Sequence, residues 1–102
     1  MENIQPGTLK KRIESKEALN IIDVRQPEEH ADFNIGGKLI PLGDIMSMQI
    51  DEIENLKEQE IICYCRSGQR SMQACLFLES LGFKNVNNLA GGMLAWMAEF
   101  GR

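Results

Sequence analysis

Short apolar runs rich in β-forming residues alternate along this chain with amphipathic segments. Residues 19–24 and 60–64 have the composition of buried strands, and residues 38–41 and 85–89 that of shorter strands. Strands that alternate with helices usually pair in parallel, because each helix brings the chain back to the end of the sheet at which the previous strand began. The pattern therefore predicts an α/β fold built on a parallel sheet.

Four segments have the apolar spacing of helices: residues 8–15, a turn or two within residues 50–56, residues 70–81 and residues 92–100. The segment 70–81 is apolar around much of its circumference, so we expect it to be largely buried. Gly82 follows it as a stop signal. The apolar residues of the last segment are interpreted as core packing.

Length and composition narrow the function classes. The chain has 102 residues, 43% of them apolar and 25% charged, without a linker or repeat, so we expect one folded domain over residues 1–102. Its net charge of −4 argues against binding to nucleic acid or to an anionic membrane surface. Its apolar runs fall far short of the ~20 residues that span a bilayer. A small-molecule or protein partner is favoured.

The cysteines and the N-terminal residues indicate a compartment. The first residues lack the basic and then apolar character of a secretory signal, and three cysteines cannot all pair within the chain. We expect a cytoplasmic protein with free thiols, unless a leader was removed. One histidine, His30, and no Cys-x-x-Cys motif give no zinc site, so we expect neither a metal nor another cofactor, and His30 is interpreted as a packing or surface residue.

Residues 61–71 carry the candidate chemistry, because a buried strand there runs into Cys65 and a helix begins about five residues later. Ligands bind at the carboxyl ends of parallel strands, and a tight loop entering a helix directs backbone N–H groups at an anion. These amides, the helix N-terminus and the guanidinium groups of Arg66 and Arg70 should favour a Cys65 thiolate. Gly68 should supply a positive φ or a close approach, and a side chain there would crowd the loop.

Four motifs in order resemble the rhodanese family of sulfurtransferases over nearly the whole chain. They are Asp-Val-Arg followed by Pro-Glu-Glu in residues 21–29, Asn-Ile-Gly-Gly in residues 34–37 before Ile-Pro-Leu, the loop 65–70, and the Gly-Gly-x-x-x-Trp element in residues 89–96. Three scaffold positions depart from the usual pattern: Asn34 replaces a common His, Gly36 a common Pro, and His30 stands where an aromatic is frequent.

The resemblance implies a rhodanese-like α/β domain with a five-stranded parallel sheet flanked by helices on both faces. It implies that Cys65 takes a sulfane sulfur from a thiosulfate-like or persulfide donor, holds it as a persulfide and passes it to cyanide or a thiol. The partners would be these small molecules, with a sulfur-relay protein as a further candidate. The residues expected to cradle the substrate are Arg66, Ser67, Gly68, Gln69 and Arg70.

Two residues of the first motif are expected to support the site from behind the loop. Asp23 should lie near the pocket and hydrogen-bond to backbone or Ser/Thr donors close to the loop. Arg25 should form an ion pair within the scaffold.

Two other functions use similar residues. Cysteine-dependent phosphatases and arsenate reductases carry five residues between cysteine and arginine, whereas four separate Cys65 from Arg70, and this tighter loop suits a sulfur atom better than a tetrahedral oxyanion. A non-catalytic interaction module of the same fold would lack the thiol. A redox pair between Cys63 and Cys65 is weighed against a purely structural Cys63, and the structural interpretation is preferred for Cys63 and for Cys75.

Overall fold

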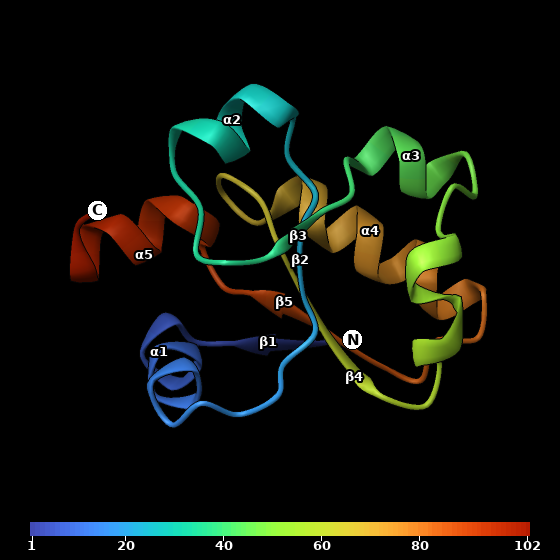
Figure 1. The fold of residues 1–102 in the computed structure, drawn as a ribbon, viewed down its shortest axis with the longest axis horizontal. Coiled ribbons are helices and arrows are strands. Elements are labelled where there is room, and N and C mark those ends of the chain that lie inside the picture. Colours follow the sequence, from blue (N-terminus) through green and yellow to red (C-terminus); the bar gives the residue numbers. More distant parts are fainter.

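The computed structural model describes residues 1–102 and is organised around a five-stranded sheet with the order β1-β5-β4-β2-β3. All neighbouring strands pair in parallel, as predicted, and Figure 1 shows their arrangement. The strands are β1 (Glu2–Ile4), β2 (Ile21–Asp23), β3 (Lys38–Leu39), β4 (Glu60–Tyr64) and β5 (Asn85–Leu89).

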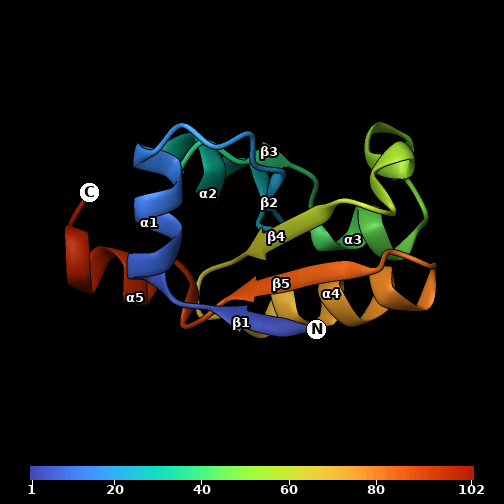
Figure 2. The ribbon, with the colours of Figure 1, turned by 90° about the horizontal axis from the view of Figure 1, so that it is seen from below.

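Helices cover both faces of this sheet, which confirms the expected fold class. They are α1 (Pro6–Glu14), α2 (Pro27–Asp32), α3 (Leu42–Met46), a 3₁₀ helix (Asp51–Leu56), α4 (Gln69–Ser80) and α5 (Gly92–Phe100). Figure 2 shows α1 beside α5, and α4 running along β5. No helix combines the length and the apolar character needed to cross a membrane.

The central strand β4 separates two apolar clusters. Ile61 and Cys63 point into the larger cluster, under α3 and α4, while Ile62 and Tyr64 point into the smaller one, under α1 and α5. All four side chains are buried, as expected for a strand with helices on both faces. The carboxyl end of β4 is therefore a rigid support for whatever follows it, and Cys65 follows it directly.

Candidate active site

Cys65 lies at the start of the loop that joins β4 to α4 and is only 1% exposed. The loop ends at Gly68, which has φ +102° and precedes the first residue of α4. A Cβ on Gly68 would lie 3.6 Å or more from its neighbours, an ordinary van der Waals distance. The expectation that a side chain here would crowd the loop is therefore wrong, and the left-handed backbone is what requires glycine.

Hydrogen-bond donors converge on the sulfur of Cys65. The N–H of Gly68 lies 3.1 Å from Sγ, and the hydroxyl of Ser71 lies 3.3 Å from it. Burial alone would raise the pKa of Cys65, but hydrogen bonds from the Ser71 hydroxyl and from the N–H groups of Ser71, Gly68 and Ser67 outweigh burial and lower this pKa below its ordinary value. Cys65 is thus favoured as a thiolate, through the loop amides and Ser71 more than through the arginines.

Asn88, on β5, forms hydrogen bonds with Gly68 in the loop and with Ser71 in the first turn of α4. Its Nδ2 donates to the Gly68 carbonyl at 3.1 Å, and its Oδ1 is hydrogen-bonded to the Ser71 hydroxyl. The side chain is buried, and so is that of Ser71. Asn88 therefore fixes the backbone of Gly68 directly, and it positions the Ser71 side chain, whose single hydroxyl hydrogen is shared between Asn88 Oδ1 and Cys65 Sγ.

The first turn of α5 holds the other side of the loop. Met93 N–H donates to the Cys65 carbonyl and Leu94 N–H to the Arg66 carbonyl, both at 2.9 Å. These two amides belong to a helix N-terminus, where N–H groups lack partners within the helix. They satisfy the loop carbonyls and leave the loop amides free to face the sulfur.

The remaining loop side chains lie toward solvent. Arg66, Ser67 and Gln69 are exposed, and Arg66 makes no ion pair. Arg70, which is expected to help cradle the substrate, is already paired, because Glu29 on α2 binds its guanidinium through two hydrogen bonds of 2.8 and 2.9 Å. Figure 1 shows α2 next to the β4–α4 loop.

Asp23 and Arg25 lie together behind the loop, but with other partners than expected. Asp23 is fully buried and accepts from Arg25 N, Nε and Nη2 at 2.8–3.0 Å, and His30 Nδ1 lies 2.8 Å from its Oδ2. The expectation of backbone or Ser/Thr donors near the loop is therefore wrong, apart from the N–H of Arg25 itself. His30 is not a plain surface residue, because it is a direct partner of the buried carboxylate.

All three cysteines are free. Cys63 and Cys75 lie in the same apolar cluster, and their mutual hydrogen bond, together with burial, raises the pKa of Cys63 well above its ordinary value. Cys63 is thus held as a neutral thiol, in accordance with a structural role. No group of His, Cys, Asp and Glu side chains has the arrangement of a metal site.

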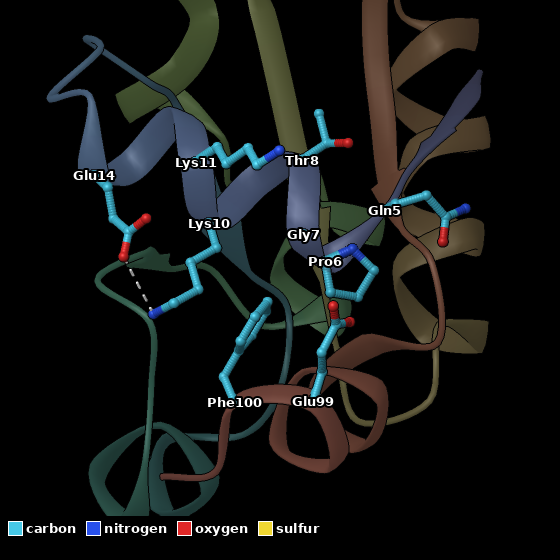
Figure 3. A pocket seen from close by; sticks show the side chains of 9 residues that line it. All are labelled: Gln5, Pro6, Gly7, Thr8, Lys10, Lys11, Glu14, Glu99 and Phe100. Atoms are coloured by element: carbon cyan, nitrogen blue, oxygen red, sulfur yellow. Dashed lines mark ion pairs between the residues drawn. The ribbon is translucent and has the colours of Figure 1, made fainter.

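The largest surface hollow, of about 550 Å³, lies elsewhere, between α1 and the end of α5. Figure 3 shows Lys10 directed at Glu14 and lying beside Phe100. Lys10 Nζ is 3.7 Å from Glu14 and 4.9 Å from the centre of the Phe100 ring. No loop residue lines this hollow, so the candidate site remains the loop at Cys65.

Comparison with known proteins agrees over nearly the full length of the chain. The family model "Rhodanese-like domain" matches residues 5–99. The putative sulfurtransferase YtwF of Bacillus subtilis is 43% identical over 101 residues, covering 97% of this chain and 93% of that protein. A sulfurtransferase of Allochromatium vinosum is 34% identical, covering 94% and 88%. The crystal structure of a rhodanese-like domain protein from Staphylococcus aureus superimposes with a TM-score of 0.83 at 31% identity, covering 94% and 91%.

Proposed function

Since this chain belongs to the rhodanese-like domain family, we propose that it is a sulfurtransferase that carries sulfane sulfur as a persulfide on Cys65. Relatives named sulfurtransferases support the activity in general. The observation that carries the proposal is the convergence of Gly68 N–H and the Ser71 hydroxyl on Cys65 Sγ. These donors stabilise a thiolate, which is the form of cysteine that attacks sulfur.

The reaction proceeds in two displacements at sulfur. In the first, the Cys65 thiolate attacks the outer sulfur of the donor, the donor S–S bond breaks, and the leaving group departs with the electron pair as sulfite or a thiolate. In the second, cyanide or an acceptor thiolate attacks the outer sulfur of the persulfide, and Cys65 leaves as a thiolate. The nucleophile is preformed in both steps, so no general base is needed.

The loop supplies stabilisation rather than proton transfer. The amides of Ser67, Gly68 and Ser71 are aimed at the sulfur before the reaction begins, so they stabilise negative charge there without reorganisation. Arg66, Ser67 and Gln69 are exposed around the mouth, where they are proposed to contact the donor. Asp23 and Arg25 are proposed to hold the carboxyl end of β2 beside the loop.

The pairing of Arg70 argues against phosphatase chemistry. An oxyanion enzyme needs its loop arginine free to bind a tetrahedral anion in a bidentate manner. Here both Nη atoms of Arg70 are occupied by Glu29. Together with the short loop, this pairing favours transfer of a single sulfur atom.

The physiological acceptor is proposed to be a thiol, on a small molecule or on a relay protein. A Bacillus subtilis relative named putative sulfur carrier protein YrkF, 40% identical over 88 residues, supports a relay, although this chain spans only about half of its length.

Intact-mass spectrometry tests the proposal directly. After incubation with a sulfane sulfur donor, the protein should gain one sulfur atom, which cyanide should remove as thiocyanate. Cys65→Ser should gain none, whereas Cys63→Ser, at the buried thiol two residues away, should still be loaded. Turnover of an aryl phosphate without sulfur gain would indicate a phosphatase, and neither reaction would indicate an interaction module. Either result would overturn the proposal.

A further inference from the structure

We infer that Glu29 sets the donor preference of the site: by neutralising Arg70, it selects against dianionic donors such as thiosulfate and in favour of organic persulfides, R–S–SH. The inference rests on the proposed sulfurtransferase function and names the substrate class of the same site. It concerns a residue on α2, outside the loop that carries the reactive cysteine.

Arg70 and Glu29 form a bidentate ion pair. Arg70 Nη1 and Nη2 donate to the two carboxylate oxygens of Glu29 at 2.8 and 2.9 Å. Glu29 Oε1 also accepts from the N–H of Gln26 at 3.0 Å, at the start of α2. This third contact anchors the Glu29 carboxylate to the backbone, so the carboxylate is held in position to bind the Arg70 guanidinium. The side chains are 34% and 29% exposed, so the pair is partly shielded from water.

The charge of Arg70 is thereby cancelled where it would otherwise attract an anion. Hydrogen bonding to Glu29 is the main cause of a raised pKa of Arg70, and the charge of Cys65 adds a smaller contribution, so Arg70 also interacts electrostatically with Cys65. A free guanidinium at this position would therefore favour an incoming dianion. Hydrogen bonding to Arg70 lowers the pKa of Glu29 to about 2, so this carboxylate remains ionised at every pH at which the thiolate is available.

The other cations near the loop do not replace Arg70. Arg25 is occupied by the buried carboxylate of Asp23. Arg66 is the one loop cation without an acidic partner, and it is exposed, so solvent screens its charge. A loop with one screened cation matches a donor with little charge better than it matches two negative charges.

The two donor classes differ in the charge they bring to the loop. With thiosulfate, the thiolate meets a dianion and the leaving group is sulfite, also a dianion. With R–S–SH, the thiolate attacks the outer sulfur of a neutral group, R–S⁻ leaves with the bonding electron pair, and the proton stays on the new Cys65 persulfide. Only the first reaction gathers three negative charges at the loop, so only the first needs a free Arg70.

Steady-state kinetics of Glu29→Gln with thiosulfate and with an uncharged alkyl persulfide, both measured at a pH at which the persulfide is R–S–SH, tests the inference. The amide cannot neutralise Arg70, so we expect kcat/KM for thiosulfate to rise about fivefold, the effect of an ion pair of roughly 1 kcal/mol, while kcat/KM for the persulfide changes less than about twofold. The matched control is Glu28→Gln, which removes the same charge from the neighbouring position of α2, where the side chain is exposed and unpaired. It should leave the ratio of the two donors unchanged.

A double-mutant cycle assigns the effect to Arg70. In an Arg70→Gln background, Glu29→Gln should no longer improve thiosulfate use, because no guanidinium remains to be released. Equal changes with both donors, a loss of activity with both, or the same shift in Glu28→Gln would overturn the inference. Sulfur loading of Cys65 in the wild-type protein would still support the proposed function. A wild-type protein that takes sulfur from neither donor would instead overturn the proposed function itself.

Discussion

Gly92, the first residue of α5, lies against the backbone carbonyl of Cys65. A Cβ on Gly92 would stand 2.5 Å from the Cys65 oxygen and 2.7 Å from the carbonyl of Arg66, and its φ is +58°. This close approach lets the next two amides of α5 reach the carbonyls of the loop. The glycine pair of the C-terminal motif therefore serves the loop at Cys65, although 27 positions separate Gly92 from Cys65 in the sequence.

We expect Gly92→Ala to reduce both sulfur loading and stability. The added methyl group collides with backbone atoms that cannot rotate away, and the left-handed conformation disfavours alanine, so the free energy of unfolding should fall by about 1–3 kcal/mol. Denaturant unfolding and intact-mass analysis measure the two effects. Gly43→Ala in α3, where a Cβ meets nothing within 4 Å, is the control and should be close to neutral. A stable, normally loaded Gly92→Ala would show that the contact can relax.

The main elements of the fold are predictable because they carry a clear hydrophobic period. The buried strands at residues 60–64 and 85–89 have the predicted bounds, and the helix predicted at residues 70–81 is shifted by one residue. The pattern predicts none of β1, α2 and the five-residue α3. β1 has three residues with one buried side chain, and α2 has none buried, so neither shows a period. The start of α2 is marked instead by Pro27 and by Glu29 bonding back to Gln26.

We expect Ser71→Ala to shift the reactivity of Cys65 toward higher pH. The Ser71 hydroxyl is the leading contribution that lowers the pKa of Cys65, and hydrogen bonds to charged groups contribute about 1.5–3 kcal/mol. Its loss should raise this pKa, so less thiolate is present at neutral pH and alkylation there should slow by about tenfold or more. Ser67→Ala retains the N–H that faces the sulfur and should leave the pKa unchanged. An unshifted alkylation profile in Ser71→Ala would assign the thiolate to the backbone alone.

The loop is predictable as a unit, but its supports are not. Ser71 follows the loop directly, whereas Asn88 comes from β5 and Glu29 from α2, and only the folded chain brings them to Cys65. The sequence does carry one signal for Asn88, because it lies in a predicted strand next to Leu89, and an amide that such a strand buries must find hydrogen-bond partners. The pairing of Arg70 has no such signal, because a Glu on a short surface helix has many possible partners.

We expect Asn88→Ala to loosen the loop. Without the amide, the Gly68 carbonyl loses its side-chain donor and the Ser71 hydroxyl loses an acceptor, both in a buried place. The unsatisfied buried carbonyl of Gly68 destabilises by about 1–3 kcal/mol, whereas the Ser71 hydroxyl keeps Cys65 Sγ as an acceptor. The pKa of Cys65 should rise as the N–H of Gly68 becomes mobile. Unfolding curves and alkylation rates report the two effects. Asn85→Ala, at the exposed start of the same strand, should change neither, and equal effects of both substitutions would remove the special role of Asn88.

Asp23 should make stability depend on pH in the acid range. Burial alone would raise its pKa, but hydrogen bonds from Arg25 and His30 outweigh burial and lower it. A carboxyl with a lower pKa in the folded state stabilises the fold above its ordinary value near 3.8. It loses that contribution as the pH falls through 3.8 toward the folded value. Asp23→Asn should flatten this part of the acid dependence.

At neutral pH the same substitution should be strongly destabilising, because Arg25, only 7% exposed, keeps its charge and loses its carboxylate. Breaking a buried pair in this way lowers the free energy of unfolding by about 3–5 kcal/mol. Asp32→Asn removes a carboxylate whose partner Arg102 is exposed, so it should have little effect at any pH. Urea unfolding of the three proteins between about pH 3 and pH 7 measures both effects. If the free energy of unfolding of Asp23→Asn depends on pH in the acid range as steeply as that of the wild type, other carboxylates cause this dependence. Glu29, with a pKa of about 2, would then be the next residue to substitute.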